Sequence, residues 1–142
     1  MNSSSPFAVI VLAAGQGTRM RSDTHKVLHP IAGKPMLMHL LDTVDGLGAK
    51  QRVVVVGKGR DQVEVALNGR GVTIAHQAEQ KGTAHAVQQA EPALAGFDGK
   101  VLILYGDTPF VAAHTLTAML ERLDGPDGPA IVVLSSPRMT RP

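Results

Sequence analysis

The sequence predicts an α/β fold: a Rossmann-like, doubly wound and mostly parallel sheet. Short runs rich in Val, Ile and Leu alternate along the chain with segments that carry apolar residues at helical spacing. The runs are apolar on both faces, which is expected where helices cover both sides of a parallel sheet. This regular alternation of strand and helix indicates one open sheet.

We expect five strands, at residues 8–12, 52–56, 72–75, 100–105 and 130–134. The helices expected between and after them cover residues 35–47, 61–67, 83–94 and 115–123. The first helix has the clearest end signals, because Pro35 stands in its first turn and Gly48 follows its last apolar residue. In such a sheet, ligands bind outside the carboxyl ends of the strands. The loops after Leu12 and Tyr105 are therefore the first places to search for a site.

The length of 142 residues fits one domain. We expect residues 1–6 to be disordered, residues 7–135 to form the domain, and residues 136–142 to be a tail. The run "SSPRMTRP" follows the last expected strand directly. We therefore expect the sheet to be incomplete at its C-terminal side.

The composition excludes several function classes. A formal net charge of +2, with three Phe, one Tyr and no Trp, argues against a nucleic-acid surface. No apolar run is long enough to span a membrane, and the start "MNSSSPF" lacks the basic region of a signal peptide. The absence of cysteine excludes disulfides and thiolate metal sites. We expect a cytoplasmic protein.

The first loop, "LAAGQGTRM" at residues 12–20, follows a buried strand. It is not a dinucleotide fingerprint, because Met20 stands where the third glycine belongs, and no Gly-Lys-Ser/Thr follows as in a P-loop. A glycine-bent loop with free backbone N–H groups suits an anion, and residues 1–34 carry four basic side chains against one acid. The alternative is a tight turn with solvated basic residues.

Two further segments carry polar side chains at the same edge. Asp107 follows the strand at 100–105 and suits Mg²⁺, although it could instead cap the turn into the next helix. In "HQAEQKGTAHAV", Gln77 and Gln80 can pair with a base edge, and Gly82 with Thr83 would begin a helix. The alternative is that both glutamines are surface residues and Thr83 is a helix N-cap.

Three motifs in this order, "LAAGQGTRMRSDTHKVLHPIAGKPM", "QAEQKGTAHAV" and "LYGDTPF", resemble a known enzyme family. They are similar to the N-terminal domain of bacterial bifunctional N-acetylglucosamine-1-phosphate uridyltransferase/glucosamine-1-phosphate acetyltransferases, over residues 7–134. The resemblance implies the nucleotide-diphospho-sugar transferase type of fold. It also implies transfer of a uridylyl group from UTP to N-acetylglucosamine 1-phosphate, with Mg²⁺ as cofactor.

The resemblance implies a role for each matching residue. Arg19 faces the departing pyrophosphate and Lys26 faces the phosphates at the reacting centre, which makes these two the implied catalytic residues. Asp107 is the implied Mg²⁺ ligand. The implied nucleotide-binding residues are Leu12, Ala13, Ala14, Gly15, Gly17, Lys26, Gln77, Gly82, Thr83, Tyr105, Gly106 and Asp107.

The sequence departs from the family after the last expected strand. The sugar-contacting loop, the second metal ligand and the hexapeptide repeats of the acetyltransferase half have no counterpart here. We therefore expect mainly the UTP half-site, weak or no turnover, and no implied oligomer. The alternatives are a nucleotidyltransferase for another base, such as a molybdenum-cofactor guanylyltransferase-like or cytidylyltransferase enzyme, and a non-catalytic nucleotide-binding module. Gln77 with Gly82 and Thr83 favours uridine.

Overall fold

The computed structural model describes residues 5–15 and 24–135. Its centre is a parallel sheet of four strands in the order β5-β4-β1-β6. The strands are β1 (Phe7–Ala13), β4 (Gln51–Val56), β5 (Thr73–His76) and β6 (Lys100–Tyr105). Four of the five expected strands are thus present within two residues of their predicted bounds. The predicted α/β class is confirmed.

Alternation of side chains along β1 builds two cores, one on each face of the sheet. Val9 and Val11 pack into the larger core, whereas Ile10 packs into the smaller one. All three are almost fully buried, since β1 pairs with β4 on one side and with β6 on the other. This central position explains why the run reads as apolar without interruption.

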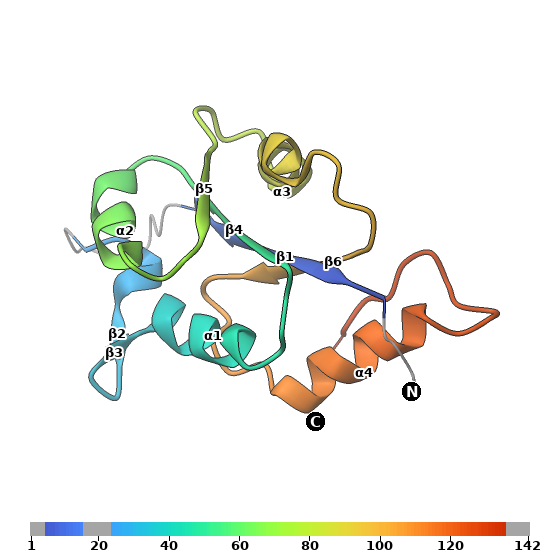
Figure 1. Cartoon of the computed structure of the whole chain (residues 1–142). Coiled ribbons are helices and arrows are strands. Elements are labelled where there is room, and N and C mark those ends of the chain that lie inside the picture. The colour runs from blue at the N-terminus through green and yellow to red at the C-terminus, as the bar shows by residue number, and fades with distance from the viewer. Residues whose placement is uncertain (1–4, 16–23, 136–142) are drawn as a thin grey trace, which may run out of the picture.

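Helices cover both faces of the sheet, as Figure 1 shows for α1 and α4 on one side and α3 on the other. The larger core contains apolar side chains of α1, α2 and α4, and the smaller core contains those of α3 and the short 3₁₀ helix η2. The bounds are α1 (Met36–Asp45), α2 (Arg60–Leu67), α3 (Thr83–Gln89), η2 (Glu91–Leu94) and α4 (Ala113–Leu123). The doubly wound arrangement is confirmed.

The helix expected at residues 83–94 is broken in two. The α-helix ends at Gln89, and a 3₁₀ turn with Pro92 near its start follows. Proline has no N–H to donate and disfavours helical backbone in the residue before it, so the α-helix stops short of it. The prediction of one continuous helix was wrong for this reason.

Between β1 and α1 the structure contains small elements that the sequence pattern did not predict. These are the 3₁₀ helix η1 (Lys26–Leu28) and a minimal antiparallel hairpin, β2 (Pro30–Ile31) with β3 (Lys34–Pro35). The hairpin turns through Ala32 and Gly33, which both have positive φ, the conformation that a two-residue hairpin loop requires. Two paired residues on each side are too few to produce an alternating pattern.

The fifth expected strand, residues 130–134, is not a strand in the structure. This run is irregular, and Ile131 and Val133 are 76% and 78% exposed. A strand requires a pairing partner, and the described residues leave the outer edge of β6 unpaired. On one face of β6, Val101, Ile103 and Tyr105 are exposed, contrary to the expectation of cover on both faces. None of the described helices is both long and apolar enough to cross a membrane.

Leu40 gives a direct test of the larger core, because its side chain in α1 is fully buried. Leu40→Ala should lower the free energy of unfolding by roughly 2–5 kcal/mol, since it removes buried methyl groups and leaves a cavity. Val65→Ala is the matched control on α2, where the side chain is 77% exposed, and should change stability by less than about 0.5 kcal/mol. Urea unfolding of both variants measures the difference, and equal effects would contradict the assigned core.

Candidate functional site

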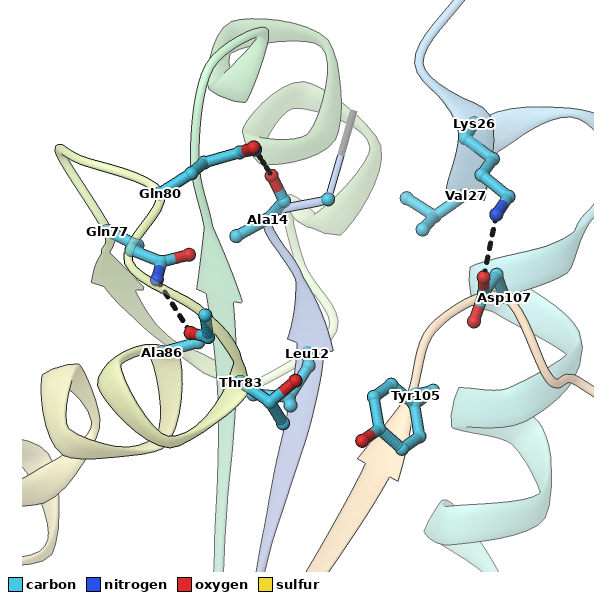
Figure 2. A pocket seen from close by; sticks show the side chains of 12 residues that line it. Leu12, Ala14, Lys26, Val27, Gln77, Gln80, Thr83, Ala86, Tyr105 and Asp107 are labelled. Atoms are coloured by element: carbon cyan, nitrogen blue, oxygen red, sulfur yellow. Dashed lines mark hydrogen bonds and ion pairs between the residues drawn. The ribbon is translucent and has the colours of Figure 1, made fainter. Parts of the chain in front are cut away.

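A pocket of about 350 Å³ lies at the carboxyl ends of the parallel strands (Figure 2). It opens where the strand order reverses: the chain proceeds from β1 outward to β4 and β5, then returns to β6 on the other side of β1. Such a reversal leaves a crevice in which α/β proteins bind ligands. The lining residues are Leu12, Ala14, Gly15, Lys26, Val27, Gln77, Gln80, Gly82, Thr83, Ala86, Tyr105 and Asp107.

The end of β1 forms the floor of the pocket. The Gly106 N–H donates to the Leu12 carbonyl at 2.9 Å, which continues the β1–β6 pairing past the strand end. At Gly15 an added Cβ would meet nothing within 4 Å, and the φ of Gly15 is outside the left-handed region. This glycine therefore leaves open space at the pocket and is not required by the backbone conformation.

A close approach at Gly57, directly after β4, supports this floor. A Cβ on Gly57 would lie 2.9 Å from the Ala14 carbonyl oxygen, so only glycine lets these two backbones pass without displacement. Gly57 was not among the predicted site residues. Its signal was a glycine at the carboxyl end of a strand, a place where backbones approach closely.

Gln80 fastens the loop after β5 to the loop after β1. Its amide nitrogen donates to the Ala14 carbonyl at 2.8 Å. Gln80 lines the pocket, but this bond already uses one of its donors. The expectation that the Gln80 amide is free to pair with a base therefore holds only for its second N–H and its oxygen.

Gln77 is buried, with 5% of its surface exposed, yet it lines the pocket. Its amide nitrogen donates to the Gly82 carbonyl at 3.2 Å and lies 2.9 Å from Nδ1 of His85. Both contacts use the nitrogen, so the amide oxygen is the group left for the pocket. In Figure 2 this oxygen lies on the side that faces the other lining residues.

Lys26 and Asp107 meet on the opposite side of the pocket (Figure 2). Lys26 Nζ lies 2.8 Å from Asp107 Oδ2, and the two side chains are 39% and 36% exposed. They come from η1 and from the loop after β6, 81 residues apart in sequence. The N-cap of α4 is Ala112, so Asp107 is not the N-cap of that helix, and its alternative role in the turn before the helix stays a prediction.

The remaining predicted residues divide into three groups. Ala13 and Gly106 are buried beside the pocket and are not among its lining residues. Thr83 lines the pocket as the first residue of α3, whose N-cap is Gly82, so the alternative of Thr83 as the N-cap is wrong. Gly17 and Arg19 lie outside the described residues.

Two lining residues, Val27 and Ala86, were missed by the sequence analysis. Ala86 stands three residues after Thr83 in α3, and residues at this spacing share a helix face. That spacing could have placed Ala86 at the pocket. Val27 belongs to the short η1 turn, which is too short to show a periodic pattern.

His25 lies directly before η1 and stabilises its start. Its Nδ1 accepts from the Val27 N–H at 3.4 Å, and its own backbone N–H donates to Gln62 Oε1 at 2.9 Å. Nε2 is buried and has no hydrogen-bond partner among the described residues. Burial, and secondarily the neighbouring His29, lower the pKa of His25 below its ordinary value. The folded protein therefore favours the neutral ring.

The described residues contain no group of three or more His, Cys, Asp or Glu side chains that could enclose a metal ion. Asp107 nevertheless holds a cation, the Lys26 ammonium, at hydrogen-bond distance. Mg²⁺ is commonly held by one or two protein carboxylates, with phosphates and water completing its shell. The donor set therefore fits a metal that arrives with a phosphate ligand and does not fit a metal enclosed by protein alone.

The pocket thus lies where open α/β sheets bind ligands, with the Lys26–Asp107 pair on one side and the Gln77 amide on the other. A family model described as the MobA-like NTP transferase domain matches residues 9–142. The chain belongs to this family of nucleotidyltransferase domains.

The relatives agree with this assignment. The chain is 64% identical over 129 residues to the bifunctional protein GlmU of Rhizorhabdus wittichii, a match that covers 91% of this chain and 28% of that protein. It is 65% identical over 130 residues to the bifunctional protein GlmU of Novosphingobium aromaticivorans, covering 92% and 29%. The resemblance based on the three motifs is confirmed. The chain spans less than a third of the length of these curated relatives.

A solved structure shows the same fold. A nucleotidyl transferase from Methanothermobacter thermautotroptrophicus superimposes with a TM-score of 0.70 at 27% sequence identity. The match covers 84% of this chain and 59% of that one. Its similarity supports the sheet order and the layers described above.

The lowered pKa of His25 leads to a prediction of how the stability of the fold depends on pH. Because its pKa is lowered in the folded state, it contributes stability that is complete above its unfolded pKa of about 6.5 and is lost as the pH falls through the folded value. The melting temperature should therefore fall between pH 7 and pH 5. His25→Asn, which retains a side-chain acceptor, should reduce this fall, whereas His114→Asn at an exposed position on α4 should not. Parallel pH profiles for both variants would contradict the role of His25.

Proposed function

We propose that this chain supplies the UTP-binding side of a nucleotidyltransferase that forms UDP-N-acetylglucosamine and pyrophosphate from UTP and N-acetylglucosamine 1-phosphate. One observation carries the proposal: a single pocket brings the Lys26–Asp107 pair and the amide of Gln77 to opposite sides. Membership of an NTP transferase family and the similarity to bifunctional GlmU proteins support it.

The two sides of the pocket suit the two ends of UTP. The Gln77 oxygen, beside Gly82 and Thr83, is an acceptor for a donor on the base. Lys26 presents an ammonium group to the phosphates, and Gly15 leaves open space for them in the lining of the pocket. Tyr105 also lines the pocket and suits contact with the nucleoside.

The reaction needs no general base from the protein. An oxygen of the sugar phosphate, already ionised, attacks the α-phosphorus of UTP, and the bond to the bridging oxygen breaks as pyrophosphate leaves. Lys26 offsets negative charge on the phosphates, and the pocket fixes the nucleotide so that the α-phosphorus is presented to the attacking oxygen. From the resemblance, we assign Arg19 to the departing pyrophosphate.

A divalent cation would be held by Asp107 together with the nucleotide phosphates. When bound there, it supplies further positive charge against the phosphates of the reacting group. In the structure the Lys26 ammonium group contacts the Asp107 carboxylate. When a metal binds, this group would either leave Asp107 or remain beside the metal on the same carboxylate. An exposed ion pair of this kind contributes only about 0–1 kcal/mol, so the rearrangement costs little.

Calorimetric titration with UTP, CTP, GTP and ATP, each with and without Mg²⁺, tests the proposal. We expect UTP to bind most tightly and Mg²⁺ to strengthen its binding, because Asp107 and the phosphates share the metal. A preference for GTP or CTP would indicate a nucleotidyltransferase for another base. A folded chain that binds none of the four nucleotides would contradict a UTP site.

Asp107→Asn tests the metal assignment separately from the base. The variant should weaken UTP binding in Mg²⁺ by about tenfold or more, while binding without Mg²⁺ changes little. Asp98→Asn is the matched control, since it removes the same charge from an exposed position before the start of β6. Circular dichroism should show both variants folded. An equal loss with and without Mg²⁺ would indicate that Asp107 acts through Lys26 alone.

A further inference from the structure

We propose that His85 is a positioning residue that determines base selectivity. It holds the amide of Gln77 in one orientation, so that the pocket presents an acceptor oxygen to the base. The inference rests on the proposed function, in which Gln77 contacts the base of the nucleotide. It assigns the preference for uracil over cytosine to a residue that does not line the pocket.

The orientation of the Gln77 amide is fixed by two acceptors on the same side. The backbone oxygen of Gly82 can only accept, so the amide group 3.2 Å away must be the nitrogen. The same nitrogen lies 2.9 Å from Nδ1 of His85. The Gln77 nitrogen donates to Nδ1 only in the tautomer that carries its proton on Nε2. In that tautomer the Gln89 amide nitrogen, 3.2 Å from Nε2, is a neighbour of the ring and not its acceptor. We assign this tautomer because the Gln77 contact is the shorter of the two.

Rotation of this amide by half a turn would be costly while His85 is in place. The oxygen would then face both the Gly82 carbonyl and the His85 lone pair, and Gln77 is too buried for water to compensate. The Gln89 side chain packs beside the His85 ring: its amide nitrogen donates to the His85 backbone oxygen at 3.1 Å, one helical turn away, and lies 3.2 Å from Nε2 of the ring. Gln77 therefore presents its oxygen and not its nitrogen.

The fixed oxygen distinguishes two pyrimidines of nearly equal shape. Uracil carries a hydrogen on its N3 and can donate to an acceptor, whereas cytosine carries a lone pair on N3 and is repelled by one. A site that leaves buried polar groups unpaired with the wrong ligand rejects that ligand strongly. If the amide could rotate, its nitrogen would donate to cytosine N3 and the discrimination would weaken.

His85→Leu removes the Nδ1 acceptor and keeps a residue that favours helices. The ratio of the CTP to the UTP dissociation constant, measured by calorimetry on the full chain in Mg²⁺, should fall by about tenfold, which is the effect of roughly one hydrogen bond. Some selectivity should remain, because Gly82 still accepts from the amide. His85→Asn restores an acceptor close to the position of Nδ1 and should keep the ratio within about threefold of the original.

A double-mutant cycle separates positioning from simple structural support. Gln77→Leu should lower the ratio by itself, and adding His85→Leu to it should change the ratio no further, because His85 acts only through Gln77. If His85→Leu does not fold, His85→Ala takes its place in the cycle. Circular dichroism and thermal unfolding accompany each variant.

Two results would overturn the inference. An unchanged ratio in folded His85→Leu would show that Gly82 alone fixes the amide, and equal weakening of UTP and CTP would show that His85 only supports α3. A further result concerns the proposed function instead: an original chain without UTP preference would remove the role of Gln77 at the base, whatever His85 does.

Discussion

The pairing of β1 with both β4 and β6 is the constraint on which the rest of this structure depends. β1 is buried on both faces and occupies an inner position in the sheet, with β4 and then β5 on one side of it and β6 on the other. Crossovers between parallel strands are right-handed, so the return of the chain from β5 to β6 carries α3 to the face opposite α1. The carboxyl ends of β1 and β6 are left with a crevice between them, and the pocket lies there.

The sequence predicts much of this arrangement, because the apolar pattern of each strand reflects its buried place in the sheet. Buried strands on a parallel sheet read as uninterrupted apolar runs, and their carboxyl ends lie on one edge whatever the strand order. This is why Gly15, Gln77 and Asp107, which follow three different strands, could be assigned to one site before the structure was known. Helix ends were predicted less well, and Pro92 shows that a single residue without an N–H can divide a helix that periodicity joins.

The sequence could not predict features that depend on pairing or on distances of a few tenths of an ångström. Residues 130–134 have the composition of a strand, but a strand forms only when a second segment of the chain pairs with it. This run is unpaired in the described part of the chain. The orientation of an amide is equally invisible in sequence. Gln77 reads as a group that both donates and accepts, and only the positions of Gly82 and His85 reduce it to an acceptor.

The two sides of the pocket are stabilised in different ways, and the difference suits the proposed reaction. Gln77 is buried with its nitrogen committed to protein acceptors, so its oxygen is preorganised for the base donor that we propose it contacts. Lys26 and Asp107 are more than one-third exposed and satisfied mainly by each other, so incoming phosphates and a metal can replace that contact at small cost. In the proposed reaction, base selection benefits from a rigid partner, whereas binding of the phosphates and the metal requires that Lys26 and Asp107 can release each other. A fixed amide and an exchangeable ion pair in one crevice meet both requirements.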